Sequence, residues 1–213
     1  MRFFAPEGYP YFALFAGISG LTLLLGGGIL TVLPVLLLGF MFYFFRDPER
    51  TVPQEEGIYV SPADGRIIVT EEIYEGEYLE SRALLVSIFM SPLNVHVNRA
   101  PCDVEVKQVK YKKGSFKKAF SAEAFHKNEH ISTVMEETGP DRKKLLVRQV
   151  AGSIAQKAVC RKKPGDTLSR GERFGIIKFS SRVDVYLPTD VELAVEIGTV
   201  VRAGETVLAR KRR

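Results

Sequence analysis

The sequence contains few of the side chains that bind transition metals. It has two cysteines, Cys102 and Cys160, and three histidines in 213 residues. The cysteines have no CxxC spacing and no histidine pair nearby, so the usual zinc patterns are missing. We expect both to be reduced, buried thiols. His126 and His130 have the spacing of one helix face, but no HExxH pattern surrounds them, so we predict no metal site.

Charged residues are absent from Gly8 to Phe45. As one helix, residues 9–45 would extend roughly 55 Å, against about 30 Å for the hydrocarbon core of a bilayer, which excludes a single span. Residues 26–28 are all glycine, and glycine near the middle of such a segment favours a tight reversal. We therefore predict that residues 1–45 form a membrane-associated helical hairpin, with arms near Tyr9–Leu25 and Ile29–Phe45.

The length of each arm is at the lower limit for crossing a bilayer, so a spanning hairpin and a re-entrant or monotopic one both stay open. Pro34 is expected to kink the second arm. Arginines flank the apolar segment at Arg2, Arg46 and Arg50, and the positive-inside tendency places both ends on the cytoplasmic side of the cell membrane. A cleaved signal peptide does not fit, because the segment is too long and no small-residue cleavage site ends it.

Residues 46–213 have the opposite composition. Only one basic and one acidic residue precede Arg46, so the formal net charge of +5 belongs to this region. A basic domain beside a hydrophobic hairpin favours an anionic lipid surface over nucleic acid as a partner. Arg182 and the basic runs at 142–144 and 161–163 fit membrane docking or lipid-phosphate binding as a set. Each one alone is equally well explained as a solvated loop charge.

Strand patterns dominate residues 46–213. Alternating or short apolar runs predict strands in Gly57–Glu72, Leu84–Met90, Val104–Tyr111, Leu145–Cys160, around Ser181, and in Val191–Leu208. Phe116–His130 is expected to be a helix or a long loop. The closing stretch resembles lipoyl-type barrels, in which Gly-x-x-Val-x-x-Gly turns join short strands. The expected fold is mainly β, of the α+β class with barrel-like hairpins, and it follows the N-terminal helical hairpin.

Three polar clusters interrupt the predicted strands and supply a carboxylate, an imidazole and a hydroxyl. The clusters SPADG, SPLNVH and FSSR contain Asp64, His96 and Ser181, in that chain order. An imidazole can take the proton of a hydroxyl while a carboxylate orients the ring. Taken alone, Ser180 and Ser181 also fit an exposed hairpin turn, and His96 also fits a packed core residue.

These clusters also carry a resemblance to a known family. The tracts FFRDPER, SPADGRI, FMSPLNVHVNRAP, GSIA followed by VC, and GERFGIIKFSSRVDVYLP run from Phe44 to near Ala209. In order and spacing they resemble the signatures of the phosphatidylserine decarboxylase family, in its short form. The resemblance implies a pyruvoyl enzyme made by self-cleavage of a proenzyme. In that family a serine hydroxyl attacks the preceding carbonyl, the ester eliminates to dehydroalanine, and hydrolysis leaves a pyruvoyl group.

Mapped onto this chain, the resemblance makes Ser181 the pyruvoyl precursor, with cleavage between Ser180 and Ser181. His96 would activate Ser181 and later protonate the substrate carbon, and Asp64 matches the family aspartate. The substrate would be phosphatidylserine or a related serine phospholipid, and the product phosphatidylethanolamine, with the pyruvoyl group as electron sink. The large and small chains would stay associated after cleavage, and a homodimer is compatible with the resemblance.

Two positions depart from the family pattern. Arg99 stands where longer members have a second histidine, so both proton-transfer steps fall to His96. Ser180 stands where the family has glycine, and a residue with a side chain resists strained backbone geometry. We therefore predict slow or blocked self-cleavage and an unprocessed chain. Two other functions stay open: a lipoyl-like carrier or adaptor domain, which needs a lysine at a hairpin tip, and a serine hydrolase that uses the same three residues.

Overall fold

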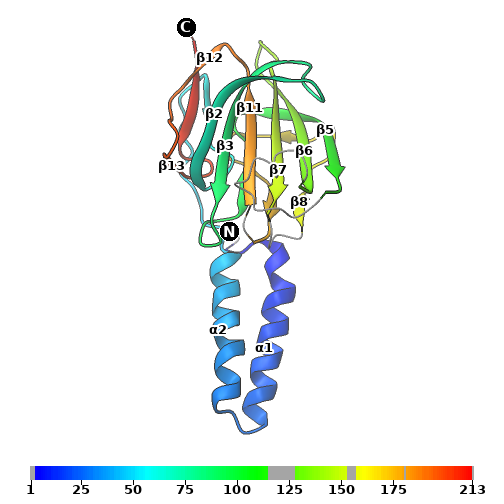
Figure 1. Cartoon of the computed structure of the whole chain (residues 1–213), viewed down its shortest axis with the longest axis vertical. Coiled ribbons are helices and arrows are strands. Elements are labelled where there is room, and N and C mark those ends of the chain that lie inside the picture. The colour runs from blue at the N-terminus through cyan, green and yellow to red at the C-terminus, as the bar shows by residue number, and fades with distance from the viewer. Residues whose placement is uncertain (1–2, 115–127, 153–156, 180, 213) are drawn as a thin grey trace. The chain divides into compact units, whose positions relative to one another are not determined.

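The first compact unit of the chain, Met1–Glu49, is a helical hairpin (Figure 1). The structure is a computed structural model and describes residues 3–114, 128–152, 157–179 and 181–212. A short 3-10 helix, η1 (Pro6–Gly8), leads into α1 (Tyr9–Leu24), and α2 (Ile29–Phe44) returns antiparallel to it.

The reversal between the helices uses three glycines, as predicted. Gly26, Gly27 and Gly28 have φ angles of 106°, 65° and 72°, a region that glycine adopts without the steric cost of a Cβ atom. The helices end at Leu24 and Phe44, so each arm is one residue shorter than expected. Helix α2 continues through Pro34.

Aromatic packing closes the open end of the hairpin. The rings of Phe12 and Phe42 stack with centroids 4.4 Å apart, and an antiparallel bridge joins Phe4 to Arg46. At the other end the apolar side chains are exposed, as Leu24 at 87% and Ile29 at 83% show. No helix in the described part of the chain combines the length and the apolarity needed to cross a bilayer.

The second unit, Arg50–Arg213, is built from antiparallel strands. They are β1 (Ile58–Val60), β2 (Gly65–Glu75), β3 (Ser81–Met90), β4 (Val97–Arg99), β5 (Val104–Lys112), β6 (His130–Glu137), β7 (Lys144–Ala151), β8 (Ala158–Cys160), β9 (Thr167–Leu168), β10 (Arg173–Ile177), β11 (Ser181–Leu187), β12 (Val191–Leu193), β13 (Val200–Val201) and β14 (Val207–Lys211). The mainly β fold after a helical hairpin is therefore confirmed.

The largest sheet has the order β13-β2-β3-β11-β7-β6-β5-β9. Two three-stranded sheets have the orders β1-β14-β12 and β4-β10-β8. Strand β11 lies between β3 and β7 (Figure 1) and pairs with β3 along its whole length. On β11, Val183, Val185 and Leu187 alternate into the main core, as the period of two in a strand requires.

The structure excludes the alternative of an exposed turn at Ser181 and agrees with the strand predicted around that residue. That residue is 0% exposed and opens β11, whereas β10 belongs to a different sheet. The two flanking strands therefore do not form a hairpin. Tertiary packing has overridden the local preference of serine for turns.

Other expectations have mixed outcomes. The predicted turns at Gly198 and Gly204 are confirmed, with φ angles of 94° and 77°. Most of Phe116–His130, including His126 of the histidine pair, lies outside the described residues, and His130 begins β6 rather than ending a helix or loop. Both cysteines are free thiols; Cys102 is buried as expected, and burial raises its pKa, while Cys160 is half-buried.

Candidate active site

Three neighbouring strands bring the predicted residues to one edge of the large sheet. Strand β2 begins directly after Asp64, β3 ends shortly before His96, and β11 begins at Ser181. Because β2 and β11 both pair antiparallel with β3, the start of each lies beside the end of β3. Strand β3 lies between β2, which follows Asp64, and β11, which begins at Ser181. Strands β2 and β11 are therefore two interstrand distances apart, about 10 Å.

Ser181 is enclosed by protein on both sides. Its backbone pairs with Met90 on β3 and Ala151 on β7. Its Oγ lies 3.4 Å from the Sδ atom of Met90, and the residue is 0% exposed. The hydroxyl that the family resemblance assigns to self-cleavage is therefore directed into the interior.

His96 lies at the same edge and is also completely buried. Its carbonyl oxygen accepts a hydrogen bond from the amide of Ile177, the last residue of β10, at 3.3 Å. The ring atom Nδ1 lies 2.9 Å from the Asn94 carbonyl oxygen. A carbonyl can only accept, so Nδ1 is the protonated nitrogen, and in the neutral ring Nε2 carries the lone pair.

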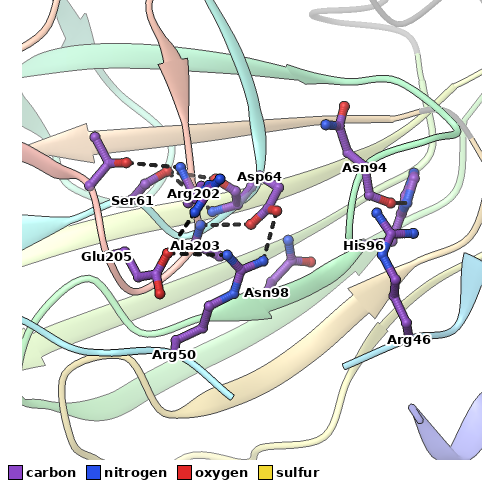
Figure 2. A network of polar contacts seen from close by, with 12 residues as sticks. Arg46, Arg50, Ser61, Asp64, Asn94, His96, Asn98, Arg202, Ala203 and Glu205 are labelled. Carbon is purple, nitrogen blue, oxygen red and sulfur yellow. Dashed lines mark hydrogen bonds and ion pairs between the residues drawn. The ribbon is translucent and has the colours of Figure 1, made fainter. Parts of the chain in front are cut away.

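Asp64 is held by two donors (Figure 2). Its Oδ1 accepts from the Ala203 amide at 2.8 Å, and its Oδ2 accepts from Nη2 of Arg50 at 2.8 Å. The guanidinium of Arg50 also donates from Nη1 to Glu205 at 3.2 Å. Both oxygens of the carboxylate are thus engaged, and the ring of His96 is oriented by Asn94.

A second group of buried polar side chains joins β7 to β4 and β4 to the turn before β10. Gln149 on β7 donates to Asn98 on β4 at 2.8 Å, and both side chains belong to fully buried residues. Arg99, at the position of the family's second histidine, is 4% exposed and donates to the Gly171 carbonyl at 3.0 Å. Arg99 therefore stabilises the loop that precedes β10 through this hydrogen bond.

Basic residues that the sequence offered for lipid phosphate have acidic partners. The pairs are Arg182 with Asp184 at 2.9 Å, Lys143 with Asp190 at 3.1 Å, Lys162 with Glu172 at 2.7 Å, and Arg142 with Glu136. Arg182 is also only 3% exposed. The Arg182–Asp184 pair is buried, which favours a structural role for Arg182, whereas the other three pairs are partly exposed and contribute little to stability.

Sequence reasoning missed the part that Arg50 and Glu205 play at Asp64. Arg50 was assigned to the membrane boundary, and Glu205 lies 155 positions along the chain from it. The available signal was the position of Arg50 at the end of the FFRDPER tract. No local pattern connects that tract with the turn that contains Glu205.

Comparisons with known proteins identify the family of this chain. The family model described as phosphatidylserine decarboxylase matches residues 37–209. A phosphatidylserine decarboxylase proenzyme of Desulfotalea psychrophila is 44% identical over 206 residues, covering 97% of this chain and 95% of that protein. The proenzymes of Magnetococcus marinus and Chlorobium luteolum are 40% and 46% identical, over 97% and 82% of this chain and 94% and 80% of their own lengths.

These matches define the class first: the chain is an enzyme of the decarboxylase type, a carbon–carbon lyase. It belongs to the phosphatidylserine decarboxylase family. The predicted family is therefore confirmed.

Proposed function

We propose that this chain is a proenzyme that cleaves itself between Ser180 and Ser181 and then decarboxylates phosphatidylserine, or a related serine phospholipid, to the ethanolamine lipid. The observation that carries the proposal is the shared edge of β2, β3 and β11, which gathers Asp64, the loop of His96 and the buried Ser181. Ser180 itself lies outside the described residues. The relatives named above are all called proenzymes, which fits a precursor.

Cleavage needs a base near the Ser181 hydroxyl. Oγ attacks the carbonyl carbon of residue 180, the C–N bond breaks, and an ester forms. Loss of the Ser181 α-proton then expels the carboxylate of the large chain and leaves dehydroalanine, and hydrolysis releases ammonia to give the pyruvoyl group. Nε2 of His96 is the base we assign, because Asn94 holds the Nδ1–H.

The backbone next to the scissile bond is strained. Phe179 has a φ angle of 57°, in the left-handed region that costs a residue with a Cβ atom about 1–2 kcal/mol. Strain of this kind persists only where the surroundings enforce it, and it is common at functional sites. Ser180 therefore adds a second side chain to a tract that already departs from ordinary geometry, which supports slow cleavage.

The space around Ser181 suits the pyruvoyl group, which has no more heavy atoms than the serine residue it replaces. When formed, the group supplies an electron sink for the electron pair left by departing CO2. His96 returns one proton to the substrate carbon, a step suited to an imidazole near neutral pH. Burial of Ser181 and His96 keeps bulk water from this proton transfer.

The large and small chains would remain together after cleavage. Residues 181–213 contribute β11 to the middle of the large sheet, β13 beside β2, and β14 beside β1. Breaking one peptide bond before β11 removes none of these ladders.

We assign residues 1–45 to membrane association and residues 46–213 to the chemistry. The exposed apolar side chains of the hairpin support this division, since contiguous apolar surface marks a membrane or protein contact. A lipid substrate then never has to leave the membrane. Arginines at both ends of the apolar segment favour the cytoplasmic face of the cell membrane.

The two rival functions have less support in the geometry. The closing turns around Gly198 and Gly204 contain no lysine for a lipoyl or biotinyl group, and the second turn bonds to Asp64 instead. A hydrolase triad needs the aspartate on the histidine ring, whereas Asp64 is bonded to Arg50 and Ala203.

Intact mass tests the proposal directly. We expect Ser180→Gly to split fastest, because glycine adopts strained backbone geometry that a residue with a side chain resists, and to give a small chain of about 33 residues (181–213) with a pyruvoyl N-terminus. Ser181→Ala, which lacks the attacking hydroxyl, stays whole and inactive.

The contrary result is equally clear. If the parent chain and Ser180→Gly both stay whole and neither consumes phosphatidylserine in detergent micelles, the proposal is wrong. Labelling of Ser181 by a fluorophosphonate without chain cleavage would point to the hydrolase.

A further inference from the structure

The guanidinium of Arg50 lies between two carboxylates at the edge of the active site (Figure 2). Nη2 lies 2.8 Å from Asp64 and Nη1 lies 3.2 Å from Glu205. The side chains of Arg50 and Asp64 are only 8% and 12% exposed. Charge-assisted hydrogen bonds of this burial are stronger than surface ion pairs and fix direction as well as distance.

The side chains of Arg50, Asp64 and Glu205 form a closed ring of hydrogen bonds, which is completed by the backbone from Ala203 to Glu205. Glu205 accepts the Thr51 amide at 3.2 Å as well as Arg50, while Asp64 accepts the Ala203 amide at 2.8 Å. Ala203 and Glu205 flank Gly204, whose φ is 77° and whose added Cβ would lie 3.0 Å from the side chain of Arg99. The turn therefore requires glycine, and its backbone sets the position of both contacts.

From this ring we infer that Arg50 is a positioning residue of the active site that acts through Asp64. The inference rests on the proposed function, because it assumes that Asp64 serves cleavage and turnover. Arg50 and the Ala203 amide each orient one oxygen, so together they fix the plane of the carboxylate. Without Arg50, Oδ2 of Asp64 would lose its side-chain donor, and the Ala203 amide would hold only Oδ1.

The ring also joins the two products of the proposed cleavage. Arg50 and Asp64 belong to the large chain, whereas Ala203 and Glu205 belong to the small chain. The bonds are remote in sequence from the scissile bond, so cleavage leaves them intact. Arg50 thus orients Asp64 in the same way in the precursor and in the processed enzyme.

The test compares Arg50→Met and Arg50→Lys in a Ser180→Gly background, where cleavage is fast enough to follow. The readouts are the cleavage rate and the kcat and KM for phosphatidylserine in detergent micelles. We expect Arg50→Met to lower the cleavage rate and kcat by about 10- to 100-fold with little change in KM, the loss expected for a charge-assisted hydrogen bond. Arg50→Lys, which keeps the charge, should recover most of this loss.

Lys211→Met is the matched control. Lys211 also joins the small chain to the large chain, through a 2.6 Å contact with Glu137, but the contact is away from the edge that carries Ser181. We expect its cleavage rate to stay within about twofold of the parent, because Glu137 ends β6 and the start of that strand is the end nearer Ser181. An equal loss in Lys211→Met and Arg50→Met would mean that Arg50 only holds the chains together, which overturns the inference.

A double-mutant cycle with Asp64→Asn separates the inference from the proposed function. If Arg50 acts through Asp64, adding Arg50→Met to Asp64→Asn causes no further loss. A full additional loss would show that Arg50 acts independently, and the inference fails while the proposed function stands. An unchanged rate in Asp64→Asn alone would instead remove Asp64 from the proposed function, and the role of Arg50 with it.

Glu205→Gln is the replacement variant for the test if thermal unfolding shows that Arg50→Met does not fold. The amide oxygen still accepts from Arg50 but without charge, so we expect a smaller loss of about 3- to 10-fold. A cleavage rate in Glu205→Gln equal to that of the parent would show that the ring of hydrogen bonds around Arg50 is not needed. That result would contradict the inference.

Discussion

The helical hairpin and the β unit place apolar and charged side chains in opposite ways. At the tip of the hairpin, Leu24 and Ile29 are more than four-fifths exposed. In the β unit, Asp184, Arg182 and Arg148 are buried at 0%, 3% and 7% exposure. The tip of the hairpin therefore exposes apolar side chains, whereas the β unit holds charged side chains out of water.

The buried charges of the β unit are stabilised by partners on the same strand or on other strands of the large sheet. Asp184 accepts from the Ser87 hydroxyl at 2.6 Å and pairs with Arg182. Arg148 lies 3.3 Å from Glu75 and donates to the Tyr186 hydroxyl at 3.0 Å. A charge can stay in such an interior only while these partners remain, because desolvation is costly.

Removing one buried partner should give the largest effect. In a Ser181→Ala background that keeps one chain, we expect Asp184→Ala to lower the free energy of unfolding by about 3–5 kcal/mol, since Arg182 loses its counter-charge. Urea unfolding in detergent measures this. The control is Asp190→Ala, which removes a 54% exposed partner of Lys143 and should cost no more than about 1 kcal/mol. Equal losses would show that burial does not distinguish the two pairs.

Charging the hairpin tip should have an intermediate effect, on membrane binding alone. We expect the quadruple change Leu24→Glu, Leu25→Glu, Ile29→Glu and Leu30→Glu to weaken binding to phosphatidylethanolamine–phosphatidylglycerol vesicles by about tenfold or more. Vesicle flotation measures the bound fraction, and the unfolding of the β unit should not change. Tyr74→Glu, at an exposed site of β2, should float like the parent. Unaltered flotation of the tip variant would argue against membrane insertion of the hairpin.

The smallest effect should come from the pH dependence of the β unit. Burial lowers the pKa of His130 below its ordinary value, Arg148 and Lys112 add to this, and the Asn128 carbonyl opposes it. The folded state therefore favours the neutral ring. The resulting stability is present above the unfolded pKa of about 6.5 and is lost as the pH falls through the lower folded pKa.

His130→Gln removes this titration. Urea midpoints at pH 7.5 and 5.5 should therefore differ less in His130→Gln than in the parent. A parent and variant that lose stability equally on acidification would show that His130 is not the group responsible.

Sequence patterns located most of the secondary structure. The glycine-centred hairpin and the strands β3, β5 and β7 follow from local composition and from the period of two in a strand. The exposed-turn alternative at Ser181 fails for a physical reason. Serine favours turns on its own, but here β3 and β7 supply backbone partners on both sides and bury it.

The sequence by itself determined the hairpin, the mainly β class, the family, and the identity of Asp64, His96 and Ser181 as candidates, because these depend on local periodicity and on motifs. Only the tertiary structure decided that Asp64 is held by Arg50 and by an amide 139 positions away. That contact depends on how β2, β3 and the turn before β14 are brought together by pairing of distant strands. No pattern within a short stretch of chain encodes such a register.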